Sequence, residues 1–240
     1  MRIIVPVSGG KDSQATLLLA LATGRPVLPV FYYTGWDHPA VDSHLAYMER
    51  HLDLTIHRTR HAKYPTMVDL IEKYQRFPWG AGRFCTSAFK REAFRDWLDT
   101  VDGEFELWLG MRSDESVQRR NRYAGLDPEE LIPLNEFLPK KYPARIHARG
   151  VVRLPLLNYS TTAVFGVIAD AGMQACPLYA QGFDRVGCFP CLLAGKETQE
   201  RAFATEFGRQ QFATIQKLEQ RIGEKYKFQP NTAPCELCQI

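Results

Sequence analysis

A glycine-rich loop close to the N-terminus joins a short apolar segment to a helix-forming one. Residues 8–13 read Ser-Gly-Gly-Lys-Asp-Ser, the apolar residues 3–7 before them are rich in β-branched side chains, and residues 14–22 after them favour a helix. A strand, a glycine loop and a helix in this order direct several backbone N–H groups and the positive end of the helix dipole toward one point. The pattern therefore predicts an α/β domain with an anion site, suited to phosphate, at residues 8–13.

The side chains of the loop agree with a phosphate ligand. Lys11 supplies a mobile cation, and the hydroxyls of Ser8 and Ser13 can donate to phosphate oxygens. Asp12 would repel phosphate unless a divalent cation such as Mg²⁺ lies between them. The spacing differs from the GxxxxGK[ST] loop of nucleoside triphosphatases. A Gly-Gly turn that holds no ligand is the competing interpretation.

Strand-like and helix-like segments alternate along the first half of the chain. The predicted strands are 27–33, 54–57 and 105–109, and the predicted helices are 39–51, 66–74 and 86–98. This alternation indicates βαβ units and a parallel sheet flanked by helices. Because such sheets bind ligands at the carboxyl ends of their strands, we expect the loops after Val7, Tyr33 and Leu109 to line one crevice.

The pattern changes from about residue 125. Prolines interrupt it, residues 160–171 predict a short helix, and residues 195–222 predict a long amphipathic one. We therefore divide the chain into an α/β domain at 1–150, which carries the loop, and a smaller C-terminal helical region at 151–240, which carries two CxxC pairs.

The charge balance argues against a strong electrostatic field. The 240 residues include 30 Lys and Arg and 27 Asp and Glu, a formal net charge of +3. Apolar stretches are far shorter than the roughly 18 residues of a membrane-spanning helix, and the N-terminus lacks the features of a signal peptide. We therefore expect a cytoplasmic protein that makes no use of a membrane.

A basic stretch within 140–153 suits either nucleic-acid phosphates or a solvated loop, and its members are Lys140, Lys141, Arg145, Arg149 and Arg153.

Four further stretches join the loop in a recognisable order. They are residues 33–39 (YTGWDHP), residues 83–90 (RFCTSAFK), residues 110–116 (GMRSDES) with Arg119 after them, and residues 177–191 (PLYAQGFDRVGCFPC). With residues 8–13 they resemble the five motifs of the phosphoadenosine-phosphosulfate (PAPS) reductase family, within the PP-loop superfamily of ATP pyrophosphatases. The resemblance implies a Rossmann-like (HUP/PP-loop) parallel sheet flanked by helices, with a smaller cysteine-containing C-terminal appendage.

The resemblance also implies an activity and a set of site residues. Members of the superfamily split ATP between its α- and β-phosphates with Mg²⁺, and the implied catalytic residues are Lys11, Asp12 and Arg112. The implied nucleotide-binding residues are Ser8, Gly9, Gly10, Lys11, Asp12, Ser13, Thr34, Gly35, Gly110, Arg112, Glu115 and Arg119. The expected function is an ATP pyrophosphatase in sulfur transfer or in nucleic-acid modification such as DNA phosphorothioation. A sulfonucleotide (PAPS or APS) reductase and a non-catalytic nucleotide-sensing subunit are the two competing hypotheses.

Two departures from the reductase pattern favour the pyrophosphatase. Cluster-bearing sulfonucleotide reductases carry adjacent cysteines where this chain has Cys85-Thr86. Reductases of the family also place a catalytic cysteine in a tail that contains Glu-Cys-Gly, whereas this chain ends Cys-Glu-Leu-Cys-Gln-Ile.

The six cysteines include two CxxC pairs, Cys188 with Cys191 and Cys235 with Cys238. In a reducing compartment such spacing is typical of metal or redox sites rather than of disulfides. Two pairs supply four thiolates, which suit either zinc or a [4Fe–4S] cluster. The resemblance favours the [4Fe–4S] cluster and places Cys85 near Cys188, as a substitute ligand or a sulfur carrier. Unligated, reduced thiols are the alternative.

The resemblance further suggests which partners to expect. Besides the nucleotide they are a DNA or RNA acceptor, a cysteine desulfurase and other subunits of a modification complex, and an oligomer of this chain is compatible with the pattern.

Overall fold

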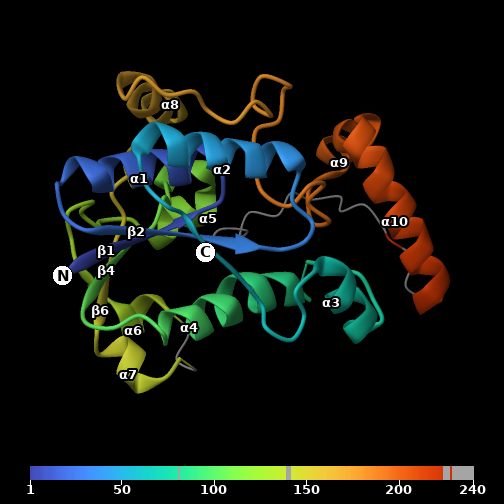
Figure 1. Ribbon diagram of the computed structural model, residues 1–240, viewed down its shortest axis with the longest axis horizontal. Coiled ribbons are helices and arrows are strands. Elements are labelled where there is room, and N and C mark those ends of the chain that lie inside the picture. Colours follow the sequence, from blue (N-terminus) through green and yellow to red (C-terminus); the bar gives the residue numbers. More distant parts are fainter. Residues whose placement is uncertain (81, 139–141, 224–227, 229–240) are drawn as a thin grey trace.

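A six-stranded sheet forms the centre of the molecule (Figure 1). The computed structural model describes residues 1–80, 82–138, 142–223 and 228. The strand order is β3-β2-β1-β4-β6-β5, in which β5 is antiparallel to β6 and every other neighbouring pair is parallel. The strands are β1 (Arg2–Val7), β2 (Val27–Tyr33), β3 (His57–Arg60), β4 (Phe105–Trp108), β5 (Ile132–Pro133) and β6 (Gly150–Arg153). The predicted parallel sheet is confirmed.

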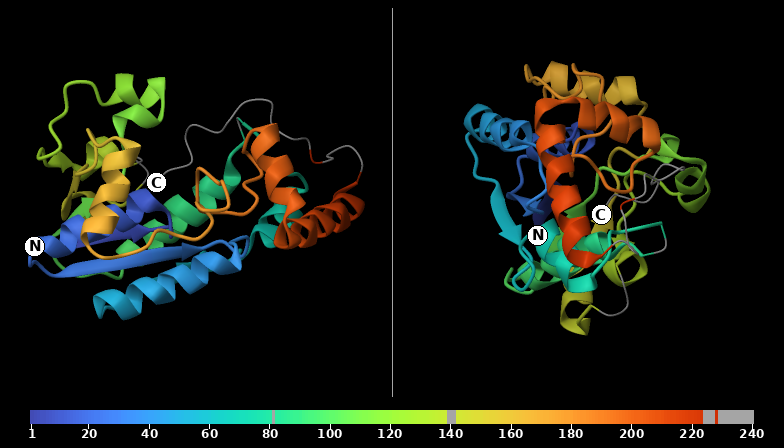
Figure 2. Two further views of the ribbon diagram at one scale, coloured as in Figure 1. Left: turned by 90° about the horizontal axis from the view of Figure 1, so that it is seen from above. Right: turned by 90° about the vertical axis from the view of Figure 1, so that its right-hand side faces the viewer.

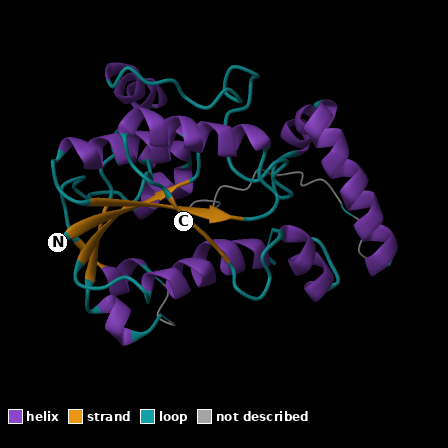
Figure 3. Ribbon diagram, in the orientation of Figure 1, coloured by secondary structure: helices purple, strands orange, loops and turns teal. Residues whose placement is uncertain are grey.

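Helices cover both faces of the sheet, as Figures 1 and 3 show. On one face lie α1 (Lys11–Ala22), α2 (Pro39–Leu52) and α8 (Thr161–Asp170), and on the other lie α4 (Ala93–Leu98), α6 (Leu134–Phe137) and α7 (Ala144–His147). Successive strand residues point to opposite faces, so Ile3 and Val5 join one core cluster and Ile4 joins the other. All three side chains are fully buried, which explains why residues 3–7 of β1 are an unbroken apolar run.

The remaining elements extend the molecule beyond the sheet. They are α3 (Met67–Tyr74), the π-helix η1 (Thr86–Glu92), the 3₁₀-helix η2 (Ser113–Glu115), α5 (Val117–Arg122), α9 (Lys196–Ala204) and α10 (Glu206–Ile222). Helices α9 and α10 lie at the end of the molecule far from the N-terminus in Figures 1 and 2. A third core cluster joins them to α3, with Leu70 and Ile71 on α3 and Ile215 and Leu218 on α10.

Two predicted elements differ from the structure. The strand expected at 54–57 lies instead at His57–Arg60. The side chain of Glu49 accepts the Ile56 N–H at 2.8 Å, so this N–H is not available to the sheet. The helix expected over 195–222 divides at Thr205, whose side chain caps α10 by accepting the Gly208 N–H at 3.0 Å.

The boundary predicted between residues 150 and 151 falls within a strand. β6 begins at Gly150 and pairs with β4 along its length. Farther along the chain, Leu156, Val164 and Ile168 pack in the same core cluster as β1. The division into two regions stays a prediction, and the residues on its C-terminal side share a core with the sheet. Within the described part of the chain, every helix is too short or too polar to cross a membrane.

Candidate functional site

The order in which the chain adds strands reverses between β1 and β4: β2 and β3 lie on one side of β1, and β4 and the later strands lie on the other. β1 pairs with β2 on one side and with β4 on the other, so the loops that follow β1 and β4 leave neighbouring strands at the same edge. Ligands of parallel α/β sheets bind at such a point. Gly110 brings the two loops together, because a Cβ on this residue would lie 2.8 Å from the carbonyl oxygen of Asp12.

The loop at 8–13 is closed by side-chain hydroxyls. The Ser8 N–H donates to Ser13 Oγ at 3.0 Å, and the Gly10 N–H donates to Ser8 Oγ at 3.4 Å. The Lys11 N–H, at the start of α1, donates to the hydroxyl oxygen of Tyr179 at 2.8 Å. Gly9 allows the turn, since its φ is +75° and a Cβ there would lie 2.9 Å from a methyl group of Val41. Three amide donors of the turn, at Ser8, Gly10 and Lys11, therefore point at neutral hydroxyl oxygens.

Three charged side chains meet beside this loop. Lys11 Nζ donates to Asp12 Oδ2 at 2.8 Å, and Arg112 Nε donates to Asp12 Oδ1 at 2.7 Å. All three residues are buried, with exposed fractions of 6%, 7% and 3% for Lys11, Asp12 and Arg112. The structure thus brings together the three residues predicted to be catalytic, which come from α1 and from the loop after β4.

Arg112 is held from several directions. Its Nη1 donates to Asp114 Oδ1 at 2.5 Å and to the Tyr159 carbonyl at 3.1 Å, and its Nη2 donates to Thr161 Oγ1 at 3.1 Å. With the bond to Asp12, four of the five guanidinium N–H donors have partners among the described residues. This geometry fixes the guanidinium next to Asp12 and leaves one donor for a ligand.

The predicted residues Glu115 and Arg119 pair with each other. Their side chains form an ion pair one helical turn apart, and both are almost fully buried. Burial lowers the pKa of Arg119, while the nearby Asp12 carboxylate acts in the opposite direction. Arg119 therefore belongs to the same charged region as Asp12 and Arg112.

Thr34 and Gly35 shape the turn after β2. Asp37 Oδ2 accepts the N–H and the hydroxyl of Thr34 at 2.9 and 2.8 Å. Gly35 has a φ of +63°, and a Cβ there would lie 2.6 Å from the side chain of Thr66. The structure explains Gly35 by packing against the start of α3. Burial raises the pKa of Asp37 despite its hydrogen bonds to Thr34.

Two of the predicted cysteine ligands lie near this turn. Asp37 and Cys188 form an antiparallel bridge, and the Cys188 thiol lies 3.7 Å from the Thr34 hydroxyl oxygen. Burial, with smaller contributions from Asp37 and the Cys85 thiol, raises the pKa of Cys188 to about 12. Cys85 and Cys188 also pack against the same core cluster.

No metal site is assembled in the described part of the chain, because no three His, Cys, Asp or Glu side chains gather around one point there. Cys188 and Cys191 are free thiols. Cys235 and Cys238, the other half of the predicted four-thiolate site, lie outside the described residues.

The arginines of the basic stretch make internal contacts. Arg145 pairs with Asp99, with Nη2 2.5 Å from Oδ2. Arg149 donates to backbone carbonyls of Leu98 and Val101, and the guanidinium of Arg153 lies 4.8 Å from the centre of the Trp108 ring. Lys140 and Lys141 lie outside the described residues.

Tyr179 was not among the predicted site residues. The sequence did contain a signal for this residue, because Tyr179 belongs to the Pro-Leu-Tyr stretch at 177–179, part of one of the five motifs that resemble the family. Its contact with Lys11 joins positions 168 residues apart, which local patterns do not reveal. Burial raises the pKa of its hydroxyl, so Tyr179 is neutral when it accepts the Lys11 N–H.

A family model covers most of the chain, and two relatives have no described activity. A family model described as "Phosphoadenosine phosphosulfate reductase domain" matches residues 2–194. An uncharacterized 37.8 kDa protein of Escherichia phage 186 is 30% identical, over 84% of this chain and 70% of the phage protein. An uncharacterized protein of Methanocaldococcus jannaschii is 28% identical over 79% of this chain, which spans only 36% of that relative.

A solved structure shows the same fold. The phosphoadenylyl-sulfate reductase of Candida auris, in a phosphate complex, has a TM-score of 0.56 with this chain at 13% identity. The match covers 79% of this chain and 82% of the Candida protein.

Proposed function

The chain belongs to the phosphoadenosine phosphosulfate reductase domain family of the PP-loop superfamily, and from that premise we propose that it is an ATP pyrophosphatase that forms AMP or an adenylated intermediate. The observation that carries the proposal is the buried cluster of Lys11, Asp12 and Arg112 beside the loop at 8–13. Such a cluster, next to the positive end of α1, suits a polyphosphate whose charge increases during the reaction.

In the proposed reaction an oxygen nucleophile attacks the α-phosphorus of ATP, and pyrophosphate leaves. The loop amides and Lys11 bind the leaving pyrophosphate, for which the hydroxyls of Ser8, Ser13 and Tyr179 must first give up their amide partners. Arg112 holds Asp12 in place and keeps one donor for a phosphate oxygen. The protein thus contributes positioning and charge neutralisation rather than covalent chemistry.

The proposed Mg²⁺ fits the donors of the site. In phosphate sites Mg²⁺ takes one or two carboxylates together with substrate phosphates and water, and Asp12 is the carboxylate beside the loop. Each Asp12 oxygen accepts one hydrogen bond and keeps a second lone pair for an ion. When bound, Mg²⁺ neutralises negative charge on the phosphates.

The experiment is to incubate the full chain with Mg²⁺ and ATP labelled at the α-phosphate, and to resolve the products. AMP and pyrophosphate are expected, and Asp12→Asn is expected to lower the rate roughly 100-fold or more, because the carboxylate that orients both cations is lost. ADP and phosphate from the wild-type protein would contradict the proposal. Nucleotide binding without turnover, even with candidate acceptors present, would instead favour the sensing subunit.

A sulfonucleotide reductase is the second candidate. The observation that favours it is the proximity of two thiols, those of Cys85 and Cys188. The two thiols interact electrostatically, and both residues pack against the same core cluster. Two incubations distinguish the activities: a reductase releases sulfite from adenylyl sulfate species and a dithiol, whereas an ATP pyrophosphatase releases pyrophosphate from ATP and Mg²⁺.

We propose sulfur transfer or nucleic-acid modification, such as DNA phosphorothioation, as the process, with a DNA or RNA acceptor and a sulfur-supplying partner. A [4Fe–4S] cluster, or zinc in its place, would need thiolates from Cys188 and Cys191 together with Cys85 or the tail cysteines. Elemental analysis and the visible spectrum of anaerobically purified protein test this, because a folded, colourless and metal-free protein would contradict both versions.

A further inference from the structure

A cavity rich in arginine lies next to the proposed nucleotide site. It has a volume of about 660 Å³, within the range of roughly 300–1,000 Å³ for ligand sites. Five arginines line it, which we call the arginine cleft: Arg76, Arg83, Arg91, Arg119 and Arg122. No acidic side chain lines it among the residues that the structure describes.

Two of these arginines carry buried nitrogens that lack an acceptor. Arg83 donates through Nε to the Gly80 carbonyl at 2.9 Å, but its Nη1 has no hydrogen-bond partner among the described residues. The Nε of Arg91 is also without a partner in that part of the chain. Buried donors are normally satisfied, so unpaired nitrogens on two arginines that line a cavity without described carboxylates indicate an anionic ligand, which these side chains would have to turn toward.

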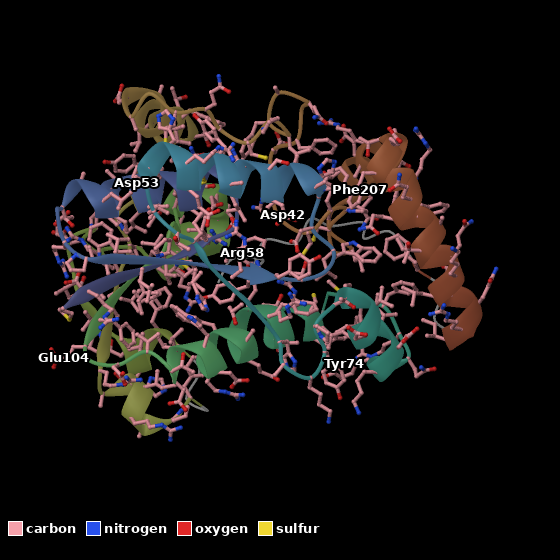
Figure 4. The ribbon with its side chains drawn as sticks, viewed as in Figure 1. Asp42, Asp53, Arg58, Tyr74, Glu104 and Phe207 are labelled. Carbon is pink, nitrogen blue, oxygen red and sulfur yellow. The ribbon has the colours of Figure 1, made fainter. Side chains whose placement is uncertain are left out.

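The aromatic rings of the cleft already have partners on their faces. Phe84 stacks on Tyr74, which Figure 4 labels at the end of α3, with ring centres 4.4 Å apart, and the guanidinium of Arg76 lies 5.5 Å from the Phe84 ring. Tyr123 lies parallel to Phe137 with ring centres 6.2 Å apart, and the guanidinium of Arg122 lies 5.5 Å from the Tyr123 ring. A nucleobase would have to displace these contacts, whereas a phosphate would not. The cleft is therefore built to recognise charge rather than bases.

The cleft meets the nucleotide site at Arg119. This residue lines the cavity and also interacts electrostatically with Asp12 and Arg112. Met111, which precedes Arg112 in the chain, lines the cavity as well. A ligand in the cleft would thus lie beside a nucleotide held by the loop at 8–13.

We infer that the arginine cleft binds phosphate groups of the second substrate, the acceptor that reacts with the nucleotide. The inference rests on the proposed function for the loop and adds the chemical class of the acceptor. Those phosphates belong either to a nucleic-acid backbone or to a small phosphorylated molecule. Both sources present anionic phosphate oxygens to guanidinium donors.

The experiment compares two double variants of the full chain with the same loss of charge. Arg83→Gln/Arg91→Gln alters the cleft, and Arg95→Gln/Arg145→Gln removes two arginines that form surface ion pairs elsewhere. The probes are a fluorescent single-stranded DNA octamer, its RNA counterpart and inorganic tripolyphosphate, each titrated at several salt concentrations. ATP binding is measured in parallel for every variant.

We expect the cleft variant to bind at least one probe ten or more times more weakly, and the surface variant to bind like wild type. For the octamers the slope of log K against log salt is expected to fall by about 1.4 for two lost arginine contacts. An effect confined to the octamers identifies a nucleic-acid backbone, and an effect on tripolyphosphate alone identifies a small phosphorylated substrate. Equal effects of the two double variants, or no binding of any probe by wild type, would overturn the inference.

Two further measurements keep these outcomes distinct. Thermal unfolding reports whether the cleft variant is folded, and Arg122→Gln, an exposed member of the cleft, repeats the test if it is not. ATP binding is expected to be unchanged in the cleft variants. Loss of probe binding with intact ATP binding supports the inference, whereas wild-type protein that binds a probe but never ATP would contradict the proposed function alone.

Discussion

Arg112 and Asp12, one hundred residues apart in the chain, form a buried ion pair in which Nε lies 2.7 Å from Oδ1. The pair joins the loop after β4 to the first turn of α1. It therefore fixes the relative position of the two segments that meet at the proposed nucleotide site.

Replacing Arg112 by Gln should destabilise the fold strongly. The substitution leaves the buried Asp12 with Lys11 as its direct ion-pair partner among the described residues, and removing one partner of a buried ion pair costs roughly 3–5 kcal/mol. Urea unfolding measures the change. Arg145→Gln is the control, since it breaks an exposed pair with Asp99 and should leave stability close to wild type. An equal decrease in the free energy of unfolding in the two variants would show that the buried Arg112–Asp12 pair stabilises the fold no more than an exposed pair does.

Tyr179→Phe should lower stability and tighten pyrophosphate binding at the same time. Without the hydroxyl, the Lys11 N–H loses its acceptor, which costs about 1 kcal/mol in the unliganded protein. Pyrophosphate then no longer has to displace the hydroxyl, so its affinity should rise about fivefold, the equivalent of that energy.

Tyr47→Phe is the matched control for this substitution. The Tyr47 hydroxyl accepts the Gln174 N–H at 3.0 Å and lies outside the loop. Its loss should lower stability by a similar amount and leave pyrophosphate affinity unchanged. The measurement is calorimetric titration of both variants with pyrophosphate. Weaker pyrophosphate binding by Tyr179→Phe would show that the Tyr179 hydroxyl contributes to binding instead of competing with it.

Gly35→Ala should be far more disruptive than Gly24→Ala. Both glycines have positive φ, +63° and +67°, so alanine is strained by about 1 kcal/mol or more at either position. Of the two, only Gly35 has a neighbour that a Cβ would overlap, the side chain of Thr66. The total for Gly35→Ala is therefore roughly 2–4 kcal/mol. Similar unfolding midpoints for the two variants would show that the turn can move away from α3.

Stability should fall as the pH drops from about 6.5 to 4, because of His44. Its side chain is 4% exposed, and burial lowers its pKa from 6.5 to about 4. Between pH 6.5 and 4 the unfolded chain binds a proton at His44 that the folded protein excludes. The free energy of unfolding therefore falls by at most roughly 3 kcal/mol over this pH range. The measurement is the free energy of unfolding against pH for wild type and His44→Gln. A curve of the same slope in the variant would contradict the assignment.

Local patterns predicted the parts of the structure that depend on neighbours in the chain. The glycines between an apolar strand and a helix were enough to predict the turn at 8–13 and the elements on either side of it. The position of β3 was wrong because a side chain, Glu49, binds the backbone N–H of Ile56, a competition that apolar patterning does not report.

The site was predicted less completely than the fold. The positions of Lys11, Asp12 and Arg112 follow from the loop and the strand order, but the partners that hold Arg112, Tyr159 and Thr161, come from a distant segment. The arginine cleft was missed for a similar reason. Its members are scattered from residue 76 to residue 122, whereas the arginines of the contiguous basic stretch make internal contacts instead.

The acceptor for the Lys11 amide has a consequence for biosynthesis. Residue 179 is made 168 residues after residue 11, which at roughly 5–20 residues per second is a delay of about 8–34 s on the ribosome. During that interval the Lys11 amide lacks the hydroxyl acceptor that Tyr179 provides in the folded protein, so this closure of the first helix is among the later contacts to form.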